Sequence, residues 1–88
     1  MVEYNHDVVS FNSDTTIKAS HGVIVSVYVT KTGSSGSKVV FKNGGSSGTT
    51  EFSIFAEQQG TYVGINRRFE DGIYADITGD AEYTVVYK

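Results

Sequence analysis

Apolar residues alternate most regularly in residues 22–30, GVIVSVYVT, which form the longest β-branched run of the chain. Side chains of a strand point to opposite faces with a period of two, so one face of this run consists of valines alone: Val23, Val25, Val27 and Val29. The pattern predicts a central strand whose valine row lines a core. The opposite row contains Ile24 and Tyr28, and it needs a further cover from another layer of the chain or from a neighbouring subunit.

Shorter strand patterns precede and follow this run, separated by clusters of Gly, Asn, Asp and Ser that favour turns. They cover residues 7–11, 15–19, 37–42, 50–56, 61–69, 73–77 and 81–87. No window shows the i, i+3, i+4, i+7 apolar spacing of a helix. The sequence therefore predicts an all-β fold, a small eight-stranded β-sandwich that is jelly-roll-like. We expect one domain over residues 1–88, with residues 1–6 as a flexible N-terminal arm because they carry no pattern.

The small size of the chain favours self-association as a source of stability. A domain of 88 residues buries only roughly 60–65% of the surface that its unfolded chain exposes, and the chain has no cysteine for a disulfide. The net charge of −3 argues against a nucleic-acid partner, which requires a basic surface. We expect neither a signal peptide nor a membrane span, because no long apolar segment is present.

Candidate chemistry is sparse. The two histidines, His6 and His21, fall in the arm and in a turn, and no nucleophile stands beside a base, so we expect no catalytic site. The carboxylates of the C-terminal third indicate a solvated acidic surface: Glu70, Asp71, Asp76, Asp80 and Glu82. Calcium binding by some of them remains an alternative, although their spacing matches no calcium loop. We predict no metal and no cofactor.

A set of apolar residues should form an interface. If the valine row packs with Phe52, Ile54, Ile73 and Ile77, the residues that must point away from the core are Ile24, Tyr28, Val40, Phe55 and Tyr74. Each of them would contribute about 1.5–3 kcal/mol when buried, against ~5 kcal/mol for an isolated domain of this size. We therefore predict a homo-oligomer. The opposite assignment, in which the valines meet the partner, also remains open.

The order of several short phrases resembles small β-sandwich proteins in the virions of tailed bacteriophages, especially marine ones. These phrases are the valine-rich residues 22–29, the Gly-Ser-Ser-Gly loop at 33–36, the strand and Asn-Gly turn at 39–44, and Gly60-Thr61-Tyr62, Gly72-Ile73-Tyr74-Ala75 and residues 83–88.

The resemblance implies a non-enzymatic structural protein, a capsid decoration or tail-associated protein that is made in the host cytoplasm and found in the virion. It also implies a trimer, with a capsid or tail protein as a further partner, and it supplies no catalytic residue. A small carbohydrate-binding or cell-surface-binding module is the alternative, because Tyr and Phe side chains can stack on sugar rings.

Overall fold

The computed structural model describes residues 6–56 and 62–88. Within these residues the chain is all-β, with eight strands: β1 (Asp7–Phe11), β2 (Thr15–Lys18), β3 (Gly22–Lys31), β4 (Lys38–Asn43), β5 (Thr49–Phe55), β6 (Tyr62–Phe69), β7 (Ile73–Thr78) and β8 (Glu82–Tyr87). Every segment predicted from the sequence is a strand, and its bounds agree within one residue. Residues 1–5 of the predicted arm lie outside the described residues, and His6 is exposed and precedes β1.

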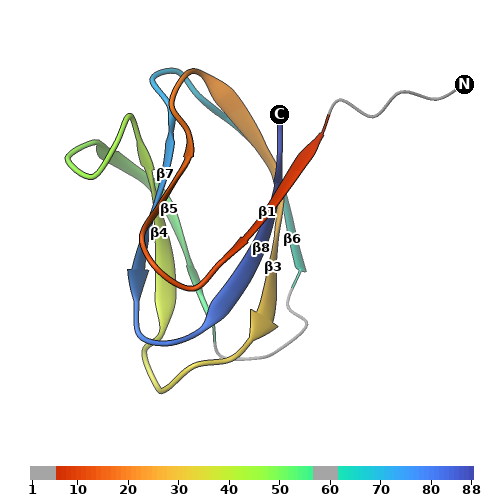
Figure 1. The fold of residues 1–88 in the computed structure, drawn as a ribbon, viewed down its shortest axis with the longest axis vertical. Helices are drawn as coiled ribbons and strands as arrows, with labels where there is room; N and C mark the ends of the chain where they lie inside the picture. The colour runs from red at the N-terminus through yellow and green to blue at the C-terminus, as the bar shows by residue number, and fades with distance from the viewer. Residues whose placement is uncertain (1–5, 57–61) are drawn as a thin grey trace, which may run out of the picture.

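The strands form two four-stranded antiparallel sheets that face each other (Figure 1). Sheet A has the order β1-β8-β3-β6, and sheet B has the order β2-β7-β4-β5. The first strand therefore pairs with the eighth, the second with the seventh, the third with the sixth and the fourth with the fifth. Additional pairing of β8 with β3 and of β7 with β4 completes each sheet.

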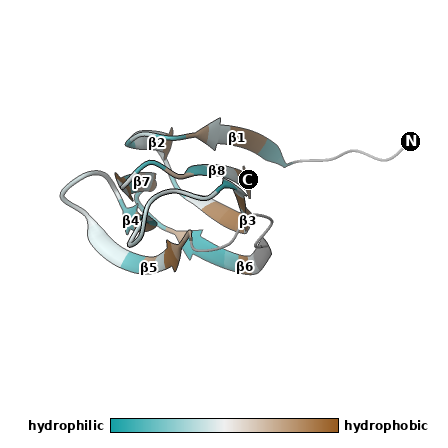
Figure 2. Cartoon of the chain, turned by 90° about the horizontal axis from the view of Figure 1, so that it is seen from below, coloured by the Kyte–Doolittle hydropathy of each residue, from teal (hydrophilic) through white to brown (hydrophobic). Residues whose placement is uncertain are grey.

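The core fills the space between the two sheets with apolar side chains from both of them. Its largest fully buried members are Tyr83, Phe41, Phe69, Ile24 and Ile73. Figure 2, coloured by hydropathy, shows apolar residues in strands of both sheets. The ring of Phe52 joins the sheets, because its centroid lies 4.9 Å from that of Phe41 in sheet B and 6.1 Å from that of Phe69 in sheet A.

The central strand β3 differs from the prediction in its first half. Ile24 is fully buried in the core, whereas Val23 and Val25 are half-buried and lie outside the core cluster. Val27 and Val29 are buried as predicted. The reason is a β-bulge: Ile24 pairs with Tyr87 and Ser26 with Val86, so Val25 is an extra residue relative to β8 and reverses the alternation. The prediction of Ile24 as an interface residue is therefore wrong.

Strand β6 carries a matching irregularity on the other side of β3. Here Gly64 pairs with Ser26 and Arg67 with Ile24, so β6 has one more residue than β3 in this interval. Asn66 adopts a φ of 52°, which Asn tolerates better than most residues. Asn66, Arg67 and Arg68, which follow Gly64 in this irregular part of β6, are all exposed.

At each end of the sandwich, two turns or loops that are far apart in the sequence are hydrogen-bonded to each other. Gly44 and Gly72 have φ values of 105° and 126°, and the Gly44 amide donates to the Gly72 carbonyl at 3.0 Å. At the opposite end, the Asp80 carboxylate accepts a hydrogen bond of 2.7 Å from the Ser34 amide. Each end is therefore held by contacts between segments distant in sequence. Over the stretches that the structure describes, no helix is long and apolar enough to cross a membrane.

Candidate functional site

The remaining predicted interface residues all have side chains that point away from the core, but they do not form one surface. Tyr28 lies on the outer face of sheet A and is 39% exposed. Val40, Phe55 and Tyr74 lie on the outer face of sheet B. Because the two outer faces are on opposite sides of the sandwich, the predicted patch divides into two separate surfaces.

The outer face of sheet B brings its three predicted residues to neighbouring register positions. Val40 stands at the centre, between Ser53 of β5 and Asp76 of β7. Tyr74 precedes Asp76 by two residues along β7, and Phe55 follows Ser53 by two residues along β5. Phe55 and Tyr74 are therefore each a diagonal neighbour of Val40, roughly 7–8 Å from it, and they lie on opposite sides of it rather than next to each other. This face is a mixed surface, with an apolar centre and charged neighbours.

The charged groups on this face make two contacts with their surroundings. The Lys42 ammonium lies 3.0 Å from the Asp76 carboxylate, between two neighbouring strands. The Lys38 ammonium lies 5.7 Å from the ring centroid of Phe55, which is within the range of a cation–π contact. The ring itself remains 54% exposed. The face therefore offers an accessible aromatic ring flanked by both signs of charge.

The outer face of sheet A carries a second exposed apolar group that the sequence analysis missed. Val8 is 64% exposed and pairs with Val86, next to Ser26. One row along, the hydroxyl groups of Ser10 and Thr84 lie 2.7 Å apart. The alternation within residues 7–11 contained the signal, since Phe11 is buried and Val8 must point the opposite way.

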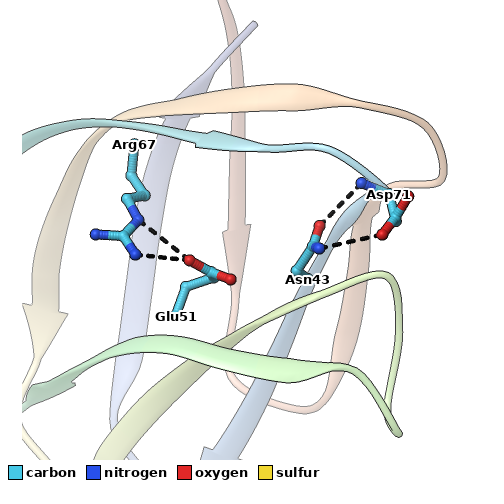
Figure 3. Close-up of polar contacts among 4 residues, drawn as sticks. All are labelled: Asn43, Glu51, Arg67 and Asp71. Atoms are coloured by element: carbon cyan, nitrogen blue, oxygen red, sulfur yellow. Dashed lines mark hydrogen bonds and ion pairs between the residues drawn. The ribbon is translucent and has the colours of Figure 1, made fainter.

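The acidic residues of the C-terminal third have separate partners rather than a common centre. Asp71 accepts a hydrogen bond from the Asn43 amide group at 3.2 Å, and its backbone N–H donates to Asn43 Oδ1 at 2.9 Å (Figure 3). Asp76 pairs with Lys42, and Asp80 accepts from Ser34. Asp80 therefore serves as an anchor for the loop between β3 and β4, and the amide of Ser34 holds the pKa of its carboxyl below the ordinary value.

The two adjacent arginines make different ion pairs. Arg67 donates from Nη2 to Glu51 Oε1 at 2.7 Å and from Nε to the same oxygen at 3.2 Å (Figure 3). This contact connects β6 of sheet A to β5 of sheet B across the open side of the sandwich. Arg68 instead pairs with Glu70 at 2.9 Å, which is a local contact in an exposed position. The Arg67 pair thus joins the two sheets, whereas the Arg68 pair stays within one short segment of the chain.

Comparisons with family models, with curated proteins and with solved structures found no match to this chain.

Proposed function

We propose that this chain is a non-enzymatic structural protein of jelly-roll type that acts by self-association and by attachment to a larger assembly, a bacteriophage virion. The observation that carries the proposal is the strand order of the two sheets, in which β1 pairs with β8, β2 with β7, β3 with β6 and β4 with β5. An exposed apolar centre on the outer face of sheet B adds to it. Support comes first from the topology and then from the surface.

The strand pairing supports the jelly-roll assignment. Pairs 1–8, 2–7, 3–6 and 4–5 are those of one long antiparallel hairpin that is wrapped into two facing sheets. A jelly roll has eight strands in two Greek keys, and viral capsid domains and lectin domains use it. Because a fold hosts many functions, this likeness raises the expectation of a virion role without supplying a binding residue.

The outer face of sheet B is the surface that we assign to self-association. Full burial of a phenylalanine stabilises by about 1.5–3 kcal/mol, so covering the exposed half of Phe55 contributes roughly 1 kcal/mol per copy. Val40 and Tyr74, both half-buried, extend the apolar centre. Lys38, whose ammonium lies over the ring of Phe55, and the Lys42–Asp76 ion pair border this apolar centre.

Three copies around a closed axis is the assembly that the resemblance favours. In such an assembly the outer face of sheet A stays outside, on the far side of each sandwich. Val8 and Tyr28 on that face are then available for contact with a capsid or tail protein. Self-association and attachment would thus use opposite faces of one small domain.

Light scattering coupled to size-exclusion chromatography tests the assignment over a hundredfold range of protein concentration. The parent chain should give a mass above that of one chain, and Phe55→Glu should lower it because the charge cannot be buried unpaired. The matched control is Val8→Glu, which places the same charge on the opposite face and should keep the parent mass. A mass of one chain at every concentration would reject self-association, and dissociation by Val8→Glu alone would move the interface to sheet A.

A carbohydrate-binding module is the second candidate, because the exposed ring of Phe55 could stack on a sugar. A glycan array with the purified parent chain and with Phe55→Ala separates the two functions. A specific hit that is lost in Phe55→Ala, at an unchanged mass, would favour sugar binding over self-association.

A further inference from the structure

A hollow of 270 Å³ is lined in part by Lys88, at the end of the chain. Figure 1 marks the position of this C-terminus. The residues that line it come from the ends of β2, β3 and β6, from the turn between β2 and β3, and from the position after β8: Lys18, His21, Gly22, Val23, Arg68 and Lys88. None of them belongs to the outer face of sheet B. The hollow is therefore independent of the surface that we assign to self-association.

Backbone pairing brings three separate parts of the sequence to this hollow. Val23 pairs with Arg68 of β6 on one side. On its other side, the Val23 amide donates to the Lys88 backbone oxygen at 2.7 Å, and the Lys88 amide donates to the Val23 carbonyl at 2.9 Å. Arg68, Val23 and Lys88 thus stand in one row across sheet A, and the two cationic side chains flank a small apolar one.

Gly22 leaves space for Lys18, the lining residue that comes from β2 of sheet B. A Cβ atom at this position would lie 2.9 Å from Lys18 Cδ, 3.0 Å from the Lys88 oxygen and 3.1 Å from Ile73 Cδ1. The absence of a side chain lets the stem of Lys18 pass over the β3 backbone. Lys18 thereby lines the same hollow as Arg68 and Lys88.

The charge of this hollow is opposite to the charge of the whole chain. The chain has a net charge of −3, with ten carboxylates against seven Lys and Arg residues. Three of those seven cations, together with one of the two histidines, line this one hollow. Among the described residues that line it, none is an Asp or a Glu, and Arg68 pairs with Glu70 at 2.9 Å in an exposed position.

We propose that this hollow is a binding site for a tetrahedral oxyanion, the phosphate or sulfate group of a small ester. The two Nη groups of Arg68, whose Nε pairs with Glu70, can donate two parallel N–H bonds to one such group, and Lys18 and Lys88 supply point charges. His21 adds a ring N–H donor at the rim. The ligand is a single group rather than a nucleic-acid backbone, because the cations surround one hollow and form no stripe along an acidic protein.

Amide chemical shifts measured during titration with sodium phosphate, at constant ionic strength held with sodium chloride, test the proposal. The chain used carries a short neutral extension after Lys88, which moves the terminal carboxylate away from the hollow. We expect saturable shifts at Gly22, Val23, Arg68 and Lys88. Glucose 6-phosphate and a sulfated disaccharide form two further arms, and the tighter of the two shows whether the site prefers a phosphate ester or a sulfate ester.

Variants decide whether the named cations hold the anion. Lys18→Gln and Arg68→Gln should each weaken phosphate binding by roughly tenfold or more, the value of one charge-assisted hydrogen bond. Lys31→Gln removes the same charge from an exposed position paired with Glu82 and should leave the affinity within twofold. Shifts that fail to saturate, or equal affinity in Lys18→Gln and Lys31→Gln, would overturn the site, whatever the mass of the Phe55→Glu variant.

Discussion

Replacing Tyr83 with phenylalanine should stabilise the domain, although it removes a polar group. The Tyr83 side chain is fully buried, and its hydroxyl has no hydrogen-bond partner among the residues that the structure describes. A buried hydroxyl without a partner costs about 1–3 kcal/mol of desolvation on folding. Phenylalanine keeps the ring, whose centroid lies 5.9 Å from that of Phe11, and removes this cost.

The magnitude can be expressed as a melting temperature. At about 2.1 cal/mol/K per residue, the unfolding entropy of 88 residues is roughly 185 cal/mol/K, so each kcal/mol shifts Tm by about 5 °C. Allowing for partial relaxation of the core, we expect Tyr83→Phe to raise Tm by about 5–10 °C in differential scanning calorimetry. Tyr74→Phe, on the outer face of sheet B, is the control and should shift Tm by less than about 2 °C.

The same residue predicts a difference at alkaline pH. Burial raises the pKa of the Tyr83 hydroxyl above its ordinary value of 10.0. The folded state therefore retains this proton when the unfolded state has lost it, and stability falls as the pH rises above 10. Tyr83→Phe lacks this contribution, so its Tm advantage should widen above pH 10. A variant that is less stable than the parent at pH 7 would refute the reasoning, because the hydroxyl would then have a partner.

Three further predictions concern the bulge, the loop anchor and the ion pair between the sheets. Ile24→Ala should destabilise by about 2–5 kcal/mol in urea unfolding and Val25→Ala by less than half as much; equal losses would contradict the bulge. The lowered pKa of Asp80 stabilises the folded state only while its carboxylate is ionised, so the parent should lose this stability as the pH falls below 3.8. Asp80→Asn lacks the carboxylate and should not show this loss. Acid-unfolding curves that run parallel for the two chains would contradict the prediction. Arg67→Ala should cost no more than about 1 kcal/mol, because the pair is exposed, and a larger loss would mean that Arg67 also packs.

Local sequence determined the strands because their signals are local. Alternation and β-branched residues marked each strand within one residue, and Asn-Gly and Asp-Gly marked two of the turns at which glycine adopts positive φ. Phe11 and Phe41 each lie in a strand whose alternation assigns them to the core face. These features depend on neighbours one to three residues away, so an isolated sequence contains the information.

The faces of β3 were decided only by tertiary structure. A bulge at Val25 depends on which residues of β8 and β6 lie opposite, and a single extra residue exchanges the two rows, so Ile24 enters the core while Val23 leaves it. The basic hollow depends on the same long-range pairing. Lys18, Arg68 and Lys88 are 50 and 20 positions apart in the chain, and they meet because β3 pairs with both β6 and the end of β8 while Gly22 leaves space for Lys18. The alternation of apolar residues along a strand does not predict which strands pair, because the free energy that selects the pairing comes from packing two sheets face to face.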